Sequence, residues 1–344
     1  MNTAEKASYF LKYAALKPVR LWNLFLIKFS RILRLPVVLG MPLTLMMEPT
    51  NFCNLKCPLC PTGAGLLGRK KALLGFVAFK RIFDQFAPYI LHLRLWNWGE
   101  PLLNPEIYKM IAYAKKHDVF VNTSTNSFFL TKENARKLVE SGLDELIISL
   151  DGASEETYKK YRKNGHFSKV VEAIKTLVLE KRKLRSKTPK IKVQFIIMRH
   201  NEHEIEKAVK LAGEIGADSI FFKTVGMMDV SIYEPLKKYL PKNREFSRYK
   251  NRRNPDKARN FCDYLWDETT INVDGSVVPC CRDSHNSYSF GNVLNEPFKK
   301  IWNNKKYVEF RKKILKNKKD IDLCRYCQGG KKELKIGEIS FKAS

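Results

Sequence analysis

Three cysteines lie close together in the first fifth of the chain, at Cys53, Cys57 and Cys60, with the spacing C-x3-C-x2-C. Three thiolates on one loop make a site for a soft metal ion or an iron–sulfur cluster. A four-iron cluster held by three cysteines keeps one iron open, which is typical of a reactive centre. A structural zinc site normally has four ligands, and the next His or Cys after Cys60 is His92. A redox C-x-x-C pair, a zinc loop and buried free thiols are the alternatives.

This loop and a later turn resemble a known family. The cysteine loop follows the apolar segment 43–47, and Gly99-Glu100-Pro101 follows a second apolar run, as in the radical S-adenosylmethionine (SAM) superfamily. The resemblance implies that the three cysteines hold a 4Fe–4S cluster whose fourth iron binds the amino and carboxylate groups of SAM. It also implies an electron donor such as flavodoxin or ferredoxin, and reductive cleavage of SAM to a 5′-deoxyadenosyl radical that takes hydrogen from the substrate.

Further residues match positions that contact SAM in this superfamily. The resemblance places Leu59 against the adenine. It places the methionine ammonium group at Gly99 and Glu100, where a carboxylate or backbone carbonyls accept hydrogen bonds. Ordinary packing, turns and solvated charges are the alternatives for such residues. The other cofactor-binding candidates, for the ribose, the methionyl group or the SAM carboxylate, are Asn126, Ser149, Asp151, Arg162 and Arg199.

Four of the five remaining cysteines form a second set near the C-terminus. The pattern Cys262-x12-Gly275-x4-Cys280, followed by Cys324-x2-Cys327, resembles the abbreviated SPASM or twitch module. The resemblance implies one auxiliary 4Fe–4S cluster with these four cysteines as ligands. On spacing alone, a zinc ribbon closed by four cysteines is the competing interpretation.

Two residues beside the second set have open roles. Cys281 is the spare thiol, but it is adjacent to Cys280, and the sequence leaves open which of the two is the ligand. Asp283 is a weak candidate for a catalytic base that deprotonates a substrate radical, because some relatives carry an acidic residue close behind a cluster cysteine. An exposed loop aspartate is the favoured interpretation of Asp283.

The chemistry-bearing residues follow short β-type segments that alternate with helical patterns. The alternation recurs about every thirty residues, as βαβ units require. It predicts an α/β fold with a parallel sheet, and six units fit a partial (β/α)6 barrel of the TIM type, which the resemblance also implies. A doubly wound sheet is the alternative, but no G-x-G-x-x-G follows the first strand. The expected strands are 43–48, 91–97, 119–123, 145–150, 190–197 and 218–223, and the expected helices 75–87, 105–117, 132–141, 155–161, 168–184 and 202–215.

In a parallel barrel the chemistry gathers at the carboxyl ends of the strands. The cysteine loop, the Gly99 turn, segments 124–126 and 149–152, and Arg199 each follow one expected strand. This convergence is stronger evidence than any single motif. The expected organisation is a basic amphipathic helical segment at 1–42, the barrel at 43–225, a linker or lid at 226–260 and a small auxiliary-cluster domain at 261–335.

The chain is strongly basic. Its 344 residues include 63 Lys and Arg against 35 Asp and Glu, a formal net charge of +28. Such a charge favours an anionic substrate, nucleic acid or an anionic membrane face, or simply reflects a basic proteome. The N-terminus lacks a secretory signal, so we expect a cytoplasmic protein with reduced thiols.

Residues 17–35 form an amphipathic pattern. On a helix, Lys17, Arg20, Lys28, Arg31 and Arg34 share one arc of about 120°, and aromatic and aliphatic residues lie opposite. The slightly favoured interpretation is a helix that packs its apolar face on the barrel and solvates its charges. The alternative is peripheral attachment to the cytoplasmic face of a membrane, since the charges interrupt the segment too often for a transmembrane span.

The sequence thus predicts a radical SAM enzyme with one auxiliary cluster. Oxidation or epimerisation of a sugar, cyclitol or similar metabolite is the first hypothesis, and modification of a peptide or protein is the alternative. A non-catalytic, zinc-stabilised nucleic-acid-binding protein is the alternative of another class, suggested by the charge and the two cysteine sets. The basic residues are spread over all helices and no RNA-binding motif appears, so no nucleic-acid partner is expected.

Overall fold

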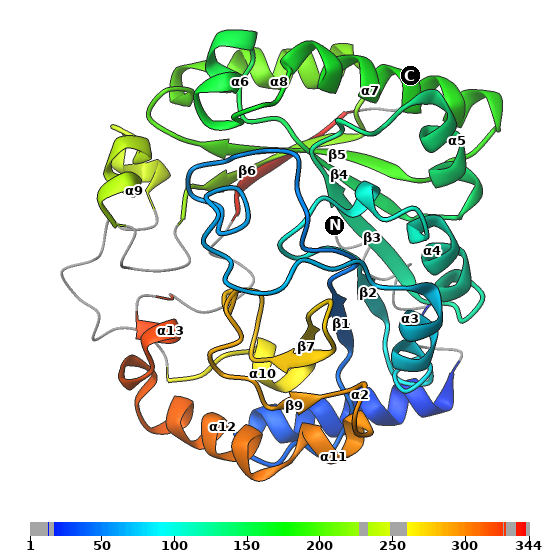
Figure 1. Ribbon diagram of the computed structural model, residues 1–344, viewed down its shortest axis with the longest axis vertical. Coiled ribbons are helices and arrows are strands. Elements are labelled where there is room, and N and C mark those ends of the chain that lie inside the picture. Colours follow the sequence, from blue (N-terminus) through cyan, green and yellow to red (C-terminus); the bar gives the residue numbers. More distant parts are fainter. Residues whose placement is uncertain are drawn as a thin grey trace.

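Six parallel strands form the centre of the structure, and each lies next to its predecessor in the chain (Figure 1). The computed structural model describes residues 17–226, 233–247, 260–325 and 335–341, together with Tyr13 and Cys327. The strands are β1 (Thr44–Met47), β2 (His92–Arg94), β3 (Phe120–Thr125), β4 (Glu145–Ser149), β5 (Lys190–Ile197) and β6 (Ser219–Thr224). Because the strand order never reverses, the sheet has no switch point and is not doubly wound.

Helices follow the strands and cover the outer side of the curved sheet (Figure 1). Their apolar faces and the strands form one large buried core. The prediction of a partial (β/α)6 barrel is confirmed, with element ends that shift by up to four residues. The helices are α3 (Phe76–Phe83), α4 (Ile107–Lys115), α5 (Lys132–Glu140), α6 (Glu155–Tyr161), α7 (Phe167–Lys183) and α8 (Ile205–Glu214).

Local signals in the sequence explain several element ends. Thr131 caps α5, since its side chain accepts a hydrogen bond from the Asn134 backbone N–H at 3.3 Å. Gly142 and Gly216 follow α5 and α8 with φ of +76° and +82°. Only glycine adopts this left-handed conformation without steric cost, and it therefore ends a helix.

The C-terminal part of the chain joins the same sheet on both sides. β7 (Glu268–Ile271) pairs in parallel with β1, and a hairpin through Gly275 leads to β8 (Ser276–Val278) and then β9 (Gly291–Asn292). At the opposite edge, β10 (Lys335–Ser340) pairs antiparallel with β6. Four short or amphipathic helices accompany these strands: α10 (Tyr264–Asp267), α11 (Phe298–Trp302), α12 (Lys305–Asn317) and α13 (Asp322–Arg325).

The N-terminal helix α2 (Pro18–Ile32) lies under this C-terminal part, and its orientation corrects the favoured expectation (Figure 1). Its polar side faces inward: Arg20, Asn23 and Ser30 are buried, whereas Trp22 and Phe25 are exposed. The Arg20 guanidinium explains the reversal, because its two terminal nitrogens donate to the backbone carbonyls of four residues inside the protein. Within the described residues, no helix has both the length and the hydrophobicity needed to cross a bilayer.

The segment expected to be a linker or lid contains α9 (Tyr233–Tyr239). Its residues Leu236 and Tyr239 are buried in a small apolar cluster together with Cys57 and Leu59 of the first cysteine loop. The described part of this segment therefore packs against the cysteine loop. The 3₁₀ turn Arg244–Phe246 follows it.

Candidate active site

The first cysteine loop starts after β1 and packs against the Gly99 turn. The backbone N–H of Glu100 donates to the Phe52 carbonyl at 2.6 Å. A Cβ atom at Gly99 would lie 2.1 Å from the Thr50 carbonyl oxygen, so no other residue fits there without moving the loop. On the other side, the Lys56 N–H donates to the Lys163 carbonyl at 3.0 Å and ties the loop to the end of α6.

The loop brings its three thiols into one apolar surrounding. Cys57 is buried, Cys53 and Cys60 are half-buried, and all three contact the cluster that contains Leu59 and Tyr161. Burial raises the pKa of Cys53 to about 12 and that of Cys57 to about 11. Such thiols stay protonated unless a cation replaces the proton, which is the behaviour expected of metal ligands before loading.

The atoms around the thiols suit an iron–sulfur cluster. The Asn126 amide nitrogen lies 3.8 Å from Cys53 Sγ, and the Arg162 Nη1 lies 3.8 Å from Cys57 Sγ, so two donors face the sulfurs. The buried Nδ2 of Asn54 has no hydrogen-bond partner among the described residues. Among the described residues, no group of three Asp, Glu, His or Cys side chains is arranged to bind a single metal ion. An iron–sulfur cluster does not need such a group, because each cysteine would bind a different iron.

Glu100 is fully buried, and its carboxylate is engaged by three donors of the protein. It accepts hydrogen bonds from Thr125 Oγ1 at 2.7 Å, from the Asn126 N–H at 2.7 Å and from the Leu102 N–H at 3.1 Å. Burial raises the pKa of the carboxyl group, and these hydrogen bonds oppose the rise. The carboxylate thus fixes the turn after β3, and the Glu100 backbone carbonyl is also engaged, since it accepts from the Leu103 N–H at 3.0 Å.

Asp151 and Arg162 form a buried ion pair beside the cysteine loop. The Arg162 Nε and Nη2 lie 2.6 and 2.5 Å from Asp151 Oδ2, and Oδ1 accepts from the Ile196 N–H at 2.7 Å. Burial alone would lower the pKa of Arg162, but Asp151, Cys57 and the neighbouring tyrosines together raise it more, and the pKa ends well above its ordinary value. Arg162 therefore stays charged, with its third nitrogen directed at Cys57.

The other sequence-predicted residues lie at different distances from the thiols. Leu59 packs next to Cys57, and Asn126 bonds Asn54 at 2.9 Å as well as approaching Cys53. Ser149 is buried at the carboxyl end of β4. Arg199 is exposed, and its Nε donates to the Leu240 carbonyl at 3.1 Å, so it holds the end of α9.

The four C-terminal cysteines predicted as ligands form a second group. Cys280 comes directly after the returning strand β8, and its raised pKa reflects burial and the neighbouring thiols Cys281, Cys262 and Cys324. Burial likewise raises the pKa of Cys262 to about 11 and that of Cys324 to about 12, and Cys327 contributes to both. These thiols, which lie far apart in the chain, are close enough to affect one another.

Cys281 and Asp283, the two residues with open roles, both lie close to the C-terminal cysteines. Cys281 is half-buried near Glu268 and Arg94, whose ion pair measures 2.9 Å. The expectation that Asp283 is exposed is wrong: the side chain is 3% exposed. Its two carboxylate oxygens accept from the N–H groups of Ser287 and Tyr288 at 2.8 and 2.9 Å, and they fix the turn behind the cysteines.

Lys318 was not anticipated from the sequence. Its side chain is among the largest that are fully buried, and its Nζ has no hydrogen-bond partner within the described residues. Burial raises the pKa values of Cys262 and Cys324, and the positive charge of Lys318 lowers both. Lys318 therefore lies near both thiols. A lone buried cation is costly unless a negative charge is close by, and four thiolates around iron would supply that charge.

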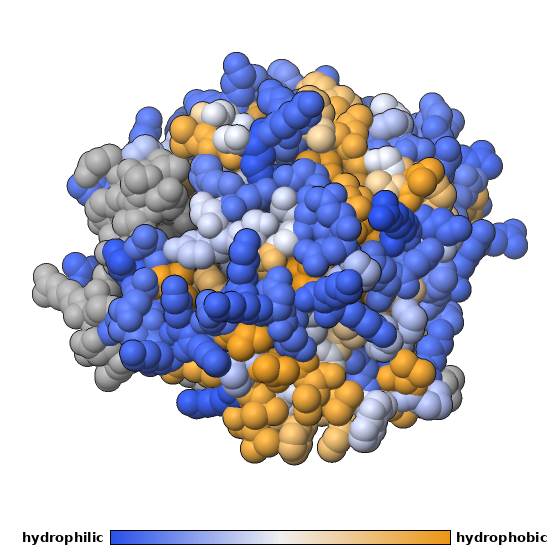
Figure 2. All heavy atoms as spheres, turned by 60° about the horizontal axis from the view of Figure 1, so that its bottom comes forward, coloured by the Kyte–Doolittle hydropathy of each residue, from blue (hydrophilic) through white to orange (hydrophobic). Residues whose placement is uncertain are grey.

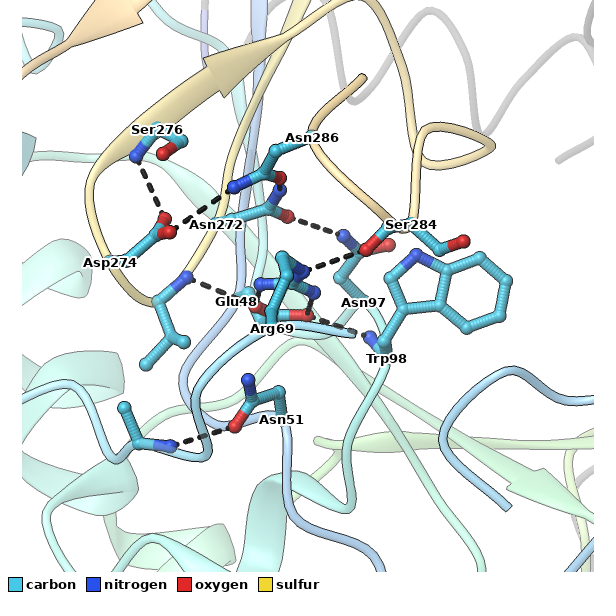
Figure 3. Close-up of polar contacts among 12 residues, drawn as sticks. Glu48, Asn51, Arg69, Asn97, Trp98, Asn272, Asp274, Ser276, Ser284 and Asn286 are labelled. Atoms are coloured by element: carbon cyan, nitrogen blue, oxygen red, sulfur yellow. Dashed lines mark hydrogen bonds and ion pairs between the residues drawn. The ribbon is translucent and has the colours of Figure 1, made fainter. Parts of the chain in front are cut away.

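A buried ion pair, also missed from the sequence, joins the two cysteine regions (Figure 3). Glu48, at the end of β1, is bound by Arg69 through two bonds of 2.7 and 2.8 Å. Its carboxylate also accepts from the Trp98 and Val273 N–H groups at 3.2 and 3.0 Å, and Arg69 donates to the Ser284 carbonyl at 2.7 Å. The only sequence signal was a lone carboxylate at the end of an apolar strand.

Amide side chains extend this connection between the β7–β8 hairpin and the end of β2. Asn97 donates to Asn272 at 2.9 Å, Asn272 bonds Asn286, and Asn286 donates to Asp274 at 3.1 Å (Figure 3). Because the first cysteine loop follows β1 and Cys280 follows β8, and this network holds the ends of both strands, their separation is fixed by the fold.

Comparison with known protein families agrees with this arrangement. The model of the radical SAM superfamily matches residues 47–212, and the model of the SPASM iron–sulfur cluster-binding domain matches residues 262–328. The chain belongs to the radical SAM superfamily and carries a C-terminal SPASM domain. It is therefore an enzyme whose cofactors are SAM, a 4Fe–4S cluster and an auxiliary iron–sulfur centre.

The similar proteins include a cofactor-modifying protein, a peptide cyclase and a maturase. The tungsten-containing aldehyde ferredoxin oxidoreductase cofactor-modifying protein of Pyrococcus furiosus is 26% identical over 301 residues, 78% of this chain and 82% of the relative. The PqqA peptide cyclase of Streptomyces rochei is 24% identical over 284 residues, 76% of each chain. The mycofactocin maturase MftC of Mycobacterium tuberculosis is 30% identical over 179 residues, but these cover 52% of this chain and only 44% of the maturase.

Solved structures share the fold. Streptococcus suis SuiB bound to S-adenosylmethionine superposes with a TM-score of 0.63 over 88% of this chain and 75% of SuiB, at 15% sequence identity. At such low identity the likeness concerns the fold alone.

Proposed function

We propose that this radical SAM enzyme modifies a peptide or a protein. In this proposal Cys53, Cys57 and Cys60 hold the cluster that binds SAM, and Cys262, Cys280, Cys324 and Cys327 hold the auxiliary cluster. The observation that carries the ligand assignment is the grouping of buried and half-buried thiols into two sets, one at the first cysteine loop and one at the C-terminal cysteines. Cys280 is preferred to Cys281, because the pKa of Cys280 responds to Cys262 and Cys324, whereas that of Cys281 responds more to Glu268 than to Cys327.

When bound, the cluster and SAM supply a carbon radical that removes a hydrogen atom from the substrate. The protein's own residues orient the reactants and keep water out. Arg162 directs a permanent positive charge at Cys57 while Asp151 holds its guanidinium. Leu59 and the cysteine loop are shielded by Leu236 and Tyr239 of α9, which limits solvent at the reacting centre.

Relatives that align with most of the chain support this substrate class. Their names describe a peptide cyclase and a protein that modifies the cofactor of another enzyme. A net charge of +28 favours an acidic peptide among possible substrates. The first hypothesis, oxidation or epimerisation of a sugar or cyclitol, has less support and becomes one outcome of the test below.

We also propose a cytoplasmic location and an electron donor of the flavodoxin or ferredoxin type, because reductive chemistry at an iron–sulfur centre needs a low-potential donor. No nucleic-acid partner is proposed. Peripheral contact with a membrane is a separate proposal, which depends on the outward face of α2.

The ligand assignment is tested by metal analysis under anaerobic conditions. We expect about eight irons per chain, as two 4Fe–4S clusters require. Replacing Cys53, Cys57 and Cys60 with alanine should remove about half of the iron and abolish reductive cleavage of SAM. Cys280→Ser should remove the auxiliary cluster, whereas Cys281→Ser, the matched control, should retain it. Zinc without iron would overturn the assignment.

The substrate class is tested with the reconstituted enzyme. Synthetic acidic peptides and a panel of amino sugars and cyclitols would be compared for their ability to raise 5′-deoxyadenosine formation above the rate without substrate. Stimulation by a peptide, with a mass change in that peptide, is the expected result. Stimulation only by a cyclitol or sugar would reject the peptide proposal and leave the ligand assignment intact.

A further inference from the structure

The outward face of α2 is an apolar surface. Of fourteen large apolar side chains that are exposed in the described part of the chain, nine lie between Val19 and Leu39. Trp22 is 63% exposed and Ile32 78% exposed. Trp22, Phe25 and Phe29 form a stacked row with ring centroids 5.2 and 6.0 Å apart. Figure 2 shows apolar atoms gathered at this end of the molecule, with hydrophilic residues around them.

This orientation is held by specific bonds and is not a loosely placed helix. Asn23 accepts from the Met41 N–H at 2.7 Å and donates to the Met41 carbonyl at 2.8 Å. Ser30 accepts from the Leu39 N–H at 3.0 Å, and Ile27 is fully buried. Turning the helix over to bury Trp22 would break these bonds and leave the Arg20 guanidinium without its four carbonyls, so the apolar face has to stay outside.

A hollow next to the aromatic row continues the apolar surface. It has a volume of about 360 Å³, and its lining includes Trp22, Leu26 and Leu39 together with Lys299 from α11. A hollow that combines apolar side chains with amide groups and one ammonium group in its lining matches the chemistry of a phospholipid, whose acyl chain is apolar and whose phosphate is anionic.

Cations available to such a lipid lie around this face. Lys28, Arg34, Lys299 and Lys300 are all exposed. The other basic residues of the helical pattern are engaged within the protein: Lys17 lies 2.6 Å from Asp118, and Arg31 lies 2.9 Å from Asp267. The exposed face therefore combines aromatic and aliphatic side chains with a basic rim.

We propose that the outward face of α2 binds the surface of an anionic lipid bilayer. With 15 residues the helix is about 22 Å long, and it would lie in the plane of the interface with Trp22, Phe25 and Phe29 inserted. Anionic headgroups would pair with Lys28, Arg34 and the α11 lysines. A second copy of this chain is the less suitable occupant, because two molecules of charge +28 repel each other, whereas an anionic bilayer attracts each of them.

The test is flotation of the full-length protein with two kinds of vesicle, one of phosphatidylcholine and one in which part of it is replaced by phosphatidylglycerol. We expect binding to the anionic vesicles that weakens as salt is added. The variant Trp22→Ser/Phe25→Ser/Phe29→Ser should lose binding to both kinds. Lys28→Glu/Arg34→Glu should weaken binding to anionic vesicles about tenfold or more.

Matched controls separate the surface from general hydrophobicity and charge. Val77→Ser/Leu179→Ser removes two exposed apolar side chains elsewhere, and Lys132→Glu reverses a charge on α5; both should bind like the unaltered protein. Thermal unfolding and reductive SAM cleavage of every variant should be unchanged, which shows that the fold and the radical site are intact. No binding by the unaltered protein, full binding by the aromatic variant, or a dimer that the aromatic variant dissociates would each overturn the proposal.

Discussion

The Asp151 carboxylate, beside the first cysteine loop, contributes strongly to the stability of the folded protein. Its side chain is fully buried and neutralises Arg162, whose side chain is 13% exposed. Asp151→Asn leaves a buried cation unpaired, so we expect the free energy of unfolding to fall by about 3 kcal/mol. Asp151→Leu combined with Arg162→Met should be less damaging than Asp151→Asn alone, because it removes both charges.

Denaturant unfolding under anaerobic conditions measures both values. Glu133→Gln, which breaks an exposed pair with Lys137 on α5, is the matched control and should leave the stability almost unchanged. Equal effects of Asp151→Asn and the control variant would contradict the importance of burial here.

Lys318 should tune the electron affinity of the auxiliary cluster. Adding an electron makes a four-thiolate cluster more negative, and a buried ammonium group near Cys262 and Cys324 stabilises that state. Lys318→Met should therefore lower the midpoint potential by roughly 60 mV, the equivalent of about 1.4 kcal/mol for one electron. A redox titration followed by electron paramagnetic resonance measures it. Lys319→Met, next to it in the chain, should leave the potential unchanged.

Among individual residues, the sequence predicted those whose spacing forms a recognisable pattern. Five of the seven cysteines could be selected because C-x3-C-x2-C and C-x2-C are local patterns, whereas Cys262 and Cys280 were selected through the resemblance to the SPASM module. Glu48, Arg69 and Lys318 could not, because their partners are distant in the chain and ordinary in type. Asp283 was recognised as a candidate, but its burial depends on a turn closed by the N–H groups of Ser287 and Tyr288, which spacing does not reveal.

Among the elements, α9 should respond to pH through His200. The imidazole contacts Tyr239 edge-on, and its Nε2 has no hydrogen-bond partner in the part that the structure describes. Burial lowers the pKa of His200 below its ordinary value of 6.5, although Asp151 pulls it the other way. The folded state thus favours the neutral ring. The contribution of the neutral ring to stability is complete above pH 6.5 and is lost as the pH falls through the lowered pKa of His200.

Hydrogen exchange of the α9 backbone checks this dependence. Protection should decrease below pH 6.5 in the unaltered protein, and His200→Gln should remove most of the decrease. His166→Gln alters a ring that is 48% exposed and should keep the pH dependence unchanged. Protection of α9 that is independent of pH in the unaltered protein would contradict the prediction.

The elements also show where pattern reasoning fails. The alternation of strands and helices predicted the six βα units, because apolar periodicity reflects which side of an element is buried. For α2 the same periodicity correctly predicted one polar and one apolar face, but the expectation that the apolar face is buried was wrong. The spacing of apolar residues identifies an apolar face and does not say whether protein or another apolar phase covers it. The bonds of Arg20 decided the orientation.

For the molecule as a whole, β10 should matter for solubility. It covers the open edge of β6 from Ser219 to Lys223, and the Glu338 carboxylate lies 3.1 Å from Lys192 Nζ on β5. Deleting 335–344 uncovers a row of unpaired backbone groups, so we expect a lower unfolding temperature and aggregation at the protein concentrations used for purification. Light scattering during a thermal ramp measures both, and deletion of 342–344 alone is the control that should behave normally.

The position of β10 and that of β7 beside β1 were not predicted. Each pairing joins segments that are more than a hundred residues apart, and no local pattern records such a pairing. The resemblance to SPASM proteins indicated a separate small domain, whereas the hairpin β7–β8 continues the barrel sheet itself.

The closed edge next to β6 also limits how a peptide can be recognised. Many proteins bind an extended peptide as an additional strand, with main-chain hydrogen bonds providing much of the affinity. Here β10 occupies the border beside β6 and becomes the border strand itself, and the other border ends in β9, which is only two residues long. A peptide substrate therefore cannot pair with β6, and the strand that could accept it as a further neighbour is β10, the last strand in the chain.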